Sequence, residues 1–172
     1  NVTNFIDLLS KIKKTQKLIY ASSSSVYGSV GGKKVTEDYS MFKPYNQYDI
    51  SKYCIDLFAM KSEVEFYGLR FGTVNGYAPI TRTDVMINAM TESALSDGEI
   101  KLYIKDIKRP ILGINDLCRA VQTIIKSKQD KRGIYNLASF NKTAEQIAYK
   151  VSYTLGIPVV EYENDPTQIK NT

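Results

Sequence analysis

The sequence contains no histidine and no tryptophan, and it has only two cysteines. Without histidine, this chain has neither Ser-His-Asp nor Cys-His nucleophiles, and it has no imidazole-ligated metal site. Any acid/base chemistry must therefore use tyrosine, lysine, aspartate or glutamate. Cys54 and Cys118 lie far apart in segments with helical patterns. We expect reduced thiols, buried as small apolar side chains, and no disulfide.

Long apolar runs are also missing. No segment approaches the ~18 apolar residues of a membrane span, and the opening stretch NVTNFIDLLSKIKK lacks the order of a signal peptide. We therefore expect a soluble, cytoplasmic protein with no membrane partner. With 172 residues, of which 43% are hydrophobic, the chain is long enough for a core of its own.

The charge pattern gives little sign of a polyanionic partner. The net charge is +5, but the basic residues occur in small groups, such as Lys33/Lys34 and Lys131/Arg132, with acidic residues between them. A nucleic-acid surface would show a basic stripe with interleaved aromatic side chains. We expect no nucleic-acid partner.

Hydrophobic periodicity predicts alternating helices and strands. Apolar side chains recur at helical spacing over residues 1–15 and again after Pro44, and apolar runs at 18–21 and 64–72 indicate strands. This order is typical of a parallel sheet with crossover helices. In the second half we expect helices over 84–95, over 116–127 with Asp116 as N-cap, and over 143–156 with a Thr143/Gln146 capping box; strands are expected at 101–104, 133–139 and 158–162.

Four consecutive serines, Ser22 to Ser25, follow the first predicted strand, and Tyr48 and Lys52 stand four apart on the following helix. Residues at this spacing share a helix face, so both side chains can reach one point. The spacing alone is a weak signal, because Tyr39 and Lys43 repeat it before Pro44. A serine-rich solvated loop is the alternative reading of the serine run.

Several stretches in order, LIYASSSSVYG, YNQYDISK, LRFGTVNGYAP, RPILGINDLCRAV and GIYNLAS, resemble the extended short-chain dehydrogenase/reductase family. The resemblance is to its NAD-dependent nucleotide-sugar epimerases and dehydratases. It implies an α/β fold, an incomplete Rossmann-like doubly wound parallel sheet with a small C-terminal substrate-binding lobe. Residues 1–78 would form part of the NAD-binding domain, and 79–172 mainly the lobe, with segments near 109–140 returning to the core.

The same resemblance implies that Tyr48 is the acid/base, that Lys52 is its partner and that Ser23 holds the reacting sugar oxygen. A phenol serves as a base at neutral pH only if its pKa falls by roughly 3 units, which is about 4 kcal/mol. An ammonium at ~4 Å supplies about 4 kcal/mol at an effective dielectric constant near 20, but only ~1 kcal/mol in bulk water. The site is therefore expected to work only when closed and dry.

Further roles follow from the resemblance alone. Thr73 stands where many members have an asparagine that touches the sugar. Arg109 matches an arginine that binds the substrate diphosphate. The implied NAD contacts are Tyr48, Lys52, Phe71 and Gly72, and the implied nucleotide-diphosphate-sugar contacts are Ser23, Ser24, Ser25, Thr73, Arg82, Asn88 and Arg109.

The family's phosphate-binding turn, Gly-x-x-Gly-x-x-Gly, is absent from this sequence. Gly28, Gly31 and Gly32 have a different spacing and follow the serine strand. We expect a chain that lacks the N-terminal half of the dinucleotide-binding domain and binds NAD weakly alone.

Three functions remain open at this point. The first is epimerisation or dehydration of a nucleotide sugar, and the nonacidic Ser24 and Ser25 favour epimerisation. The second is an NAD(P)-dependent reductase of a small carbonyl substrate. The third is a non-catalytic binding module. A homodimer is implied by the family only.

Overall fold

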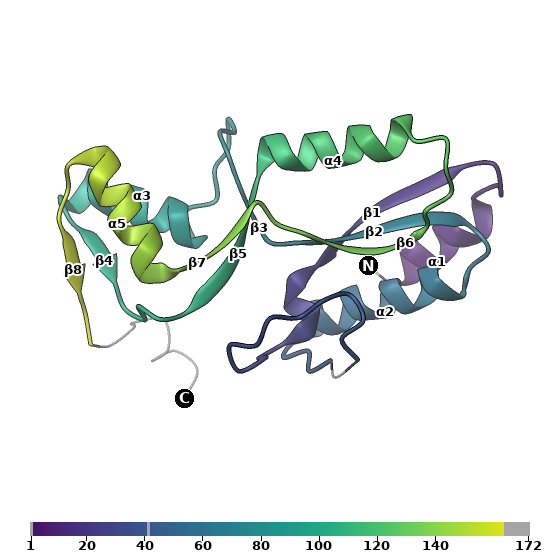
Figure 1. The fold of residues 1–172 in the computed structure, drawn as a ribbon, viewed down its shortest axis with the longest axis horizontal. Coiled ribbons are helices and arrows are strands. Elements are labelled where there is room, and N and C mark those ends of the chain that lie inside the picture. Colours follow the sequence, from purple (N-terminus) through teal and green to yellow (C-terminus); the bar gives the residue numbers. More distant parts are fainter. Residues whose placement is uncertain (1, 41, 164–172) are drawn as a thin grey trace. The chain divides into compact units, whose positions relative to one another are not determined.

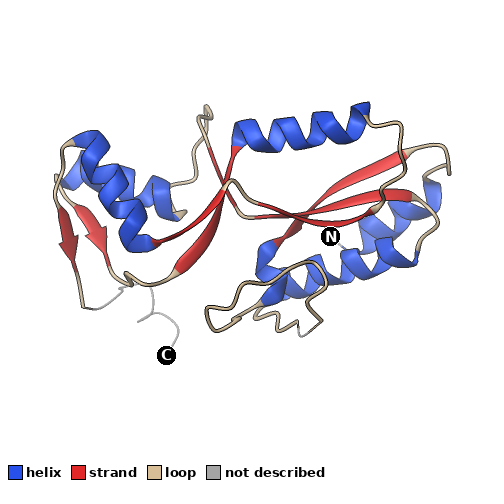
Figure 2. Ribbon diagram, viewed as in Figure 1, coloured by secondary structure: helices blue, strands red, loops and turns tan. Residues whose placement is uncertain are grey.

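The structure is a computed structural model that describes residues 2–40 and 42–163 (Figures 1 and 2). The described chain divides into two compact units. Unit 1 contains the residues up to 74 together with 112–139, and unit 2 contains 75–111 together with the residues from 140 onward. The chain therefore leaves unit 1, builds most of unit 2, returns for one helix and one strand, and then completes unit 2.

Unit 1 is a three-stranded parallel sheet with helices on both faces (Figure 1). The strand order is β1-β2-β6, and Figure 1 shows α4 on one face of the sheet with α1 and α2 on the other. The elements are α1 (Val2–Lys11), β1 (Lys17–Ser23), the 3-10 helix η1 (Ser24–Tyr27), α2 (Gln47–Lys61), β2 (Glu65–Phe71), α4 (Ile114–Lys126) and β6 (Gly133–Leu137).

Helices α1 and α2 pack on the sheet through a buried apolar cluster. Each large apolar side chain buried there contributes roughly 1.5–3 kcal/mol. Helix α2 begins where the Asn46 side chain accepts a hydrogen bond from the Asp49 amide, at 2.9 Å. The cluster is formed by Phe5, Leu18, Ile55, Ala59, Val64 and Phe66.

The register of the sheet aligns the carboxyl ends of its strands. Ser23 pairs with Phe71, and Phe71 pairs with Leu137, so these three residues form one row. In parallel α/β sheets, ligands bind beyond this edge. The predicted serine site therefore lies at the edge where a ligand is expected.

Unit 2 is built from short strands and two helices. Strands β4 and β8 pair in parallel, and β5 and β7 pair antiparallel. Its core includes Met90, Ile100, Ile111 and Ile147. The elements are α3 (Met86–Asp97), β4 (Ile100–Leu102), β7 (Phe140–Thr143), α5 (Ala144–Leu155) and β8 (Val159–Glu161), while β3 (Thr73–Asn75) and β5 (Lys108–Gly113) each have residues in both units.

The structure confirms the α/β class, the parallel sheet and the Thr143/Gln146 capping box. The prediction that Asp116 caps its helix is wrong, because α4 begins at Ile114 and Asp116 lies in its first turn. The helix expected after Pro44 begins only at Gln47, because Asn46 supplies the cap. Cys118 is exposed, which corrects its expected burial; both thiols are free.

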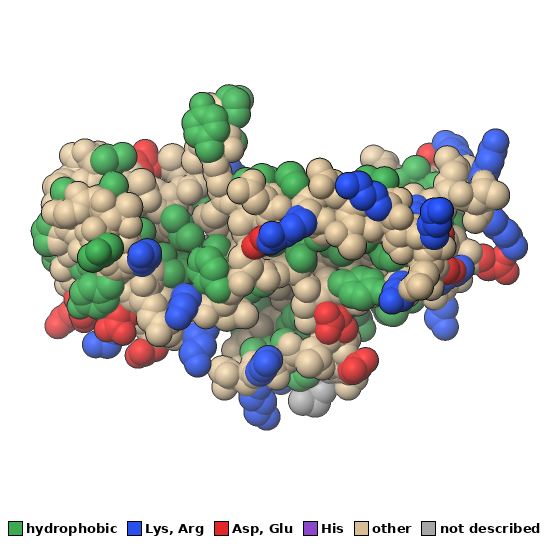
Figure 3. Space-filling view, turned by 45° about the horizontal axis from the view of Figure 1, so that its top comes forward, with side chains coloured by type: hydrophobic (Ala, Val, Ile, Leu, Met, Phe, Trp, Pro, Cys, Tyr) green, Lys and Arg blue, Asp and Glu red, His purple; other side chains and the backbone are tan. Residues whose placement is uncertain are grey.

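Two further features of the structure are the distribution of surface charge and the length of the helices. On the face drawn in Figure 3, basic and acidic side chains are interspersed. Within residues 2–40 and 42–163, no helix combines the length and apolar character needed to cross a bilayer.

Candidate active site

The serine run divides between two elements. Ser22 and Ser23 end β1, and Ser24 and Ser25 open η1. The Ser23 side chain caps this short helix by accepting a hydrogen bond from the Ser25 amide, at 3.2 Å. The run is therefore a strand end followed by the start of a short helix, which corrects the interpretation as a loop, and its exposure increases from buried Ser22 to exposed Ser25.

Gly28 ends η1 in a conformation that requires glycine. Its φ is +63°, and a Cβ atom there would lie 1.9 Å from the carbonyl oxygen of Lys43. The close approach brings the loop before α2 against the end of η1.

Helix α2 carries Tyr48 and Lys52 on one face. The Lys52 ammonium lies 5.6 Å from the centre of the Tyr48 ring and donates a 2.8 Å hydrogen bond to the carbonyl oxygen of Ala21. Burial lowers the pKa of Lys52, against the opposing effect of the Asp56 carboxylate. Tyr48 is 53% exposed, so a ligand can reach it. The structure thus brings the ammonium near both the phenol ring and the serine strand.

Asp49, which the sequence analysis missed, is joined to the serines. Its carboxylate accepts a hydrogen bond from Ser25 Oγ at 2.5 Å, and Ser25 Oγ lies 2.7 Å from Ser23 Oγ. Asp49 is only 3% exposed. A chain of hydrogen bonds therefore runs from Ser23 to a buried carboxylate.

A second buried carboxylate lies one helical turn beyond Lys52. Asp56 accepts hydrogen bonds from Ser22 Oγ at 3.0 Å, from the Tyr20 hydroxyl at 3.0 Å and from Arg70 Nε at 2.9 Å. Because this carboxylate and the burial of the ring both oppose ionisation, the pKa of Tyr20 is raised; burial is the larger cause. The signal in the sequence was Arg70, a charged residue inside an apolar strand, which needs a buried partner.

Of the predicted NAD contacts, Phe71 ends β2 in the row that contains Ser23, and Gly72 follows directly after the strand. The Gly72 amide donates to the Leu137 carbonyl at 2.9 Å, which ties this end to β6. Thr73 follows in β3. Ser24 lies in η1 beside Ser23. Unit 1 therefore contains the three predicted catalytic residues and all the predicted NAD contacts.

Three predicted substrate contacts belong to unit 2. Arg82 forms a two-point ion pair with Asp84, with Nε 2.9 Å from Oδ1, and its carbonyl accepts a 2.7 Å hydrogen bond from Asn88. Arg109 is exposed on β5, opposite Lys142 of β7. Arg82 and Asn88 are thus hydrogen-bonded to each other, whereas Arg109 lies in the sheet that contains β5 and β7.

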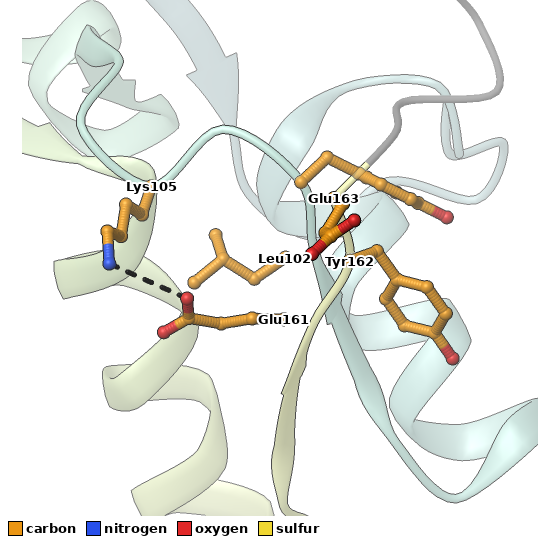
Figure 4. Close-up of a pocket in the computed structure, with 6 residues that line it drawn as sticks. Leu102, Lys105, Glu161, Tyr162 and Glu163 are labelled. Carbon is orange, nitrogen blue, oxygen red and sulfur yellow. Dashed lines mark ion pairs between the residues drawn. The ribbon is translucent and has the colours of Figure 1, made fainter.

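Unit 2 also has a pocket that involves none of the predicted site residues (Figure 4). Its volume is about 390 Å³, and Lys105 and Glu161 form an ion pair of 3.6 Å at its wall. The pocket is lined by Leu102, Tyr103, Lys105, Glu161, Tyr162 and Glu163.

Two curated proteins are similar in sequence to most of this chain. "Protein CapI" of Staphylococcus aureus is 28% identical over 163 residues, which cover 91% of this chain and 48% of that protein. A UDP-glucose 4-epimerase of Mycoplasma genitalium is 28% identical over 87% of this chain and 52% of its own length. This chain therefore spans about half the length of these curated relatives.

A solved structure confirms the Rossmann-like fold. The ADP-L-glycero-D-manno-heptose-6-epimerase of Helicobacter pylori has a TM-score of 0.78 and 28% identity, over 94% of this chain and 53% of that chain. The sequence profile of the "NAD dependent epimerase/dehydratase family" matches residues 1–138, and its description names the cofactor that the sequence predicted. This chain belongs to the NAD-dependent epimerase/dehydratase family.

Proposed function

We propose that this chain carries the acid/base residues of an NAD-dependent nucleotide-sugar epimerase. The observation that supports this most strongly is the placement of Tyr48 and Lys52 one turn apart on α2, with the Lys52 ammonium bonded to Ala21 of the serine strand. The relatives named for UDP-glucose and for an ADP-heptose suggest the substrate class.

Tyr48 takes the proton of the sugar hydroxyl as that carbon is oxidised, and returns a proton when it is reduced. The Lys52 ammonium, 5.6 Å from the centre of the Tyr48 ring, supplies a positive charge next to the phenol. Ser23 holds the reacting oxygen in line. The Ala21 carbonyl fixes the ammonium, which therefore needs little reorganisation during the reaction.

Lys52 also fits the ribose next to the nicotinamide. An ammonium has three protons, and the Ala21 carbonyl uses one of them, so two remain for ribose hydroxyls. Phe71, in the row of Ser23, and the following Gly72 would line the ring. When bound, NAD supplies a reversible hydride acceptor. The chain has no Gly-x-x-Gly-x-x-Gly turn, so we assign none of its residues to the pyrophosphate.

Two features favour epimerisation over dehydration. Dehydration needs a further acid and base next to the sugar, and Ser24 and Ser25 are not acidic. The nearby Asp49 carboxylate is buried, and both of its oxygens already accept hydrogen bonds.

Arg109 is our candidate for the diphosphate, because a guanidinium binds phosphate oxygens at two points.

The test is an activity screen of the purified chain with UDP-, GDP- and dTDP-sugars in the presence of NAD, with products separated by chromatography. Conversion of one sugar to its epimer supports the proposal. A dehydrated keto-sugar product would establish the other branch of the family. Calorimetry with NAD alone, run in parallel, separates failure to bind the cofactor from failure to turn over.

A further inference from the structure

The direction of the hydrogen bonds around Ser23 follows from the chemistry of Asp49. A carboxylate can only accept hydrogen bonds. Oδ1 of Asp49 accepts from Ser25 Oγ at 2.5 Å, and Oδ2 accepts from the Tyr45 amide at 3.2 Å. Both oxygens are therefore engaged, and Ser25 directs its single hydroxyl proton to Asp49 Oδ1.

The direction of the Ser25–Asp49 hydrogen bond also determines the direction of the bond between Ser25 and Ser23. Ser25 Oγ lies 2.7 Å from Ser23 Oγ, and either hydroxyl could donate on distance alone. Because the Ser25 proton is committed to Asp49, Ser25 accepts and Ser23 donates. Ser23 Oγ also accepts from the Ser25 amide at 3.2 Å. Ser23 is then left with one lone pair and no proton for a ligand.

We propose that Asp49 is a positioning residue that, through Ser25, fixes Ser23 as a hydrogen-bond acceptor, so that the site favours a sugar hydroxyl over a carbonyl at the reacting carbon. This inference rests on the proposed function. The sugar hydroxyl has one proton, which it donates to Ser23 in the bound substrate and gives to Tyr48 when the carbon is oxidised, whereas the resulting carbonyl has no proton to offer Ser23. Epimerisation returns the hydride to the other face of the ketone, and a ketone that Ser23 does not hold can turn.

The first experiment needs no ligand. Deuterium isotope shifts at the Cβ atoms of Ser23 and Ser25, measured by NMR on the full chain, report whether each hydroxyl proton exchanges slowly. We expect slow exchange at both serines in the wild type. In Ser25→Ala, the Ser23 proton loses its acceptor and should exchange fast. An unchanged Ser23 signal in Ser25→Ala would overturn the proposal.

The matched control is Asp116→Asn. Asp116 also lies in the first turn of a helix and also accepts a serine hydroxyl, that of Ser139. This variant makes the same chemical change at another helix N-terminus. We expect Asp116→Asn to leave the Ser23 and Ser25 signals as in the wild type. A changed Ser23 signal in this variant would count against a specific hydrogen-bond connection from Asp49 to Ser23.

The second experiment measures binding of UDP-glucose and of UDP-4-deoxy-4-fluoro-glucose, which cannot donate at C4, by calorimetry. The wild type and Asp116→Asn should bind the fluoro analogue about three- to tenfold more weakly, the factor for one neutral hydrogen bond. In Asp49→Asn, the side-chain amide can donate to Ser25, so Ser25 can donate to Ser23 and Ser23 can donate to the ligand. The difference in affinity between the two nucleotide sugars should then shrink to less than twofold. Equal ratios in Asp49→Asn and the wild type would overturn the proposal. If neither nucleotide sugar binds, the proposed substrate class fails, and the NMR result alone decides the hydrogen-bond direction.

Discussion

Asp56 and Arg70 form a buried ion pair, with 2.9 Å between Oδ2 and Nε, and their side chains are 0% and 2% exposed. The guanidinium also lies 4.9 Å from the ring centres of Tyr27 and Phe42. Asp56 belongs to α2 and Arg70 to β2, while Ser22 of β1 donates to the same carboxylate. The pair therefore anchors the helix that carries Tyr48 and Lys52 to β2, and the Ser22 hydrogen bond ties the same carboxylate to β1, the strand that carries Ser23.

Removing the Asp56 carboxylate should destabilise the protein strongly. Asp56→Ala leaves the Arg70 guanidinium buried without its partner, for which we expect a loss of about 3–5 kcal/mol in the free energy of unfolding. Urea denaturation measures it. The control is Asp97→Ala, which removes an ion pair with Lys101 at the surface and should change stability little. Equal effects of the two substitutions would contradict the anchoring role.

Tyr20 should make stability fall at alkaline pH. Its pKa is raised in the folded state, whereas the unfolded phenol titrates near 10. Above about pH 10 the unfolded state therefore loses a proton that the folded state keeps, and the stability contributed by the neutral ring, present below that pH, is lost. Tyr20→Phe should cost about 1 kcal/mol at neutral pH for the hydrogen bond to Asp56. Its stability difference from the wild type should shrink as the pH rises from 10 to 11; a constant difference would refute the assignment.

Gly68 provides the space that Tyr20 occupies. A Cβ atom at Gly68 would lie 2.4 Å from the Tyr20 hydroxyl oxygen, which cannot move without leaving Asp56. Gly68→Ala should therefore cost about 1–3 kcal/mol by overpacking. Gly133→Ala, on the neighbouring strand, meets its nearest atom only at 3.6 Å and should be tolerated. Thermal unfolding of both variants tests the contrast, which an unaffected Gly68→Ala would disprove.

Arg109 should affect substrate affinity if it binds the diphosphate. Arg109→Ala should raise KM for a nucleotide-diphosphate sugar about 10- to 100-fold, the range for a hydrogen bond to a charged group, with a smaller change in kcat. Arg119→Ala removes an exposed arginine that is paired with Asp116 on α4 and should leave KM unchanged. A KM for the nucleotide sugar that Arg109→Ala does not alter would favour a reductase of a small carbonyl substrate.

The parallel core and the Tyr48/Lys52 pair could be predicted because both depend on local spacing. The apolar runs of β1 and β2 and the i, i+4 positions on α2 are written directly in the sequence. Strands β5 and β7 were missed. Lys108, Arg109 and Pro110 begin β5, so neither its composition nor its alternation indicates a strand, and its pairing with β7 arises only in the folded unit.

The two buried carboxylates could not be predicted from the apolar pattern. Asp49, Lys52 and Asp56 lie at i, i+3 and i+7 on α2, the spacing of a helix face that usually carries apolar residues. Here that face binds the end of β1 and the start of η1 through hydrogen bonds. A polar face of this kind is recognised only once its partners are known, although Arg70 in β2 already required an acid nearby.

The most direct test of the account is the turnover of Tyr48→Phe. With NAD and the nucleotide sugar that the wild type converts best, we predict that kcat falls by about 10²- to 10⁴-fold, the contribution of a positioned acid/base group, while calorimetry shows the affinity for the sugar largely retained. Tyr45→Phe, which removes the hydroxyl of an exposed tyrosine just before α2, should keep wild-type turnover. Wild-type turnover in Tyr48→Phe would contradict the assignment of Tyr48 as the acid/base.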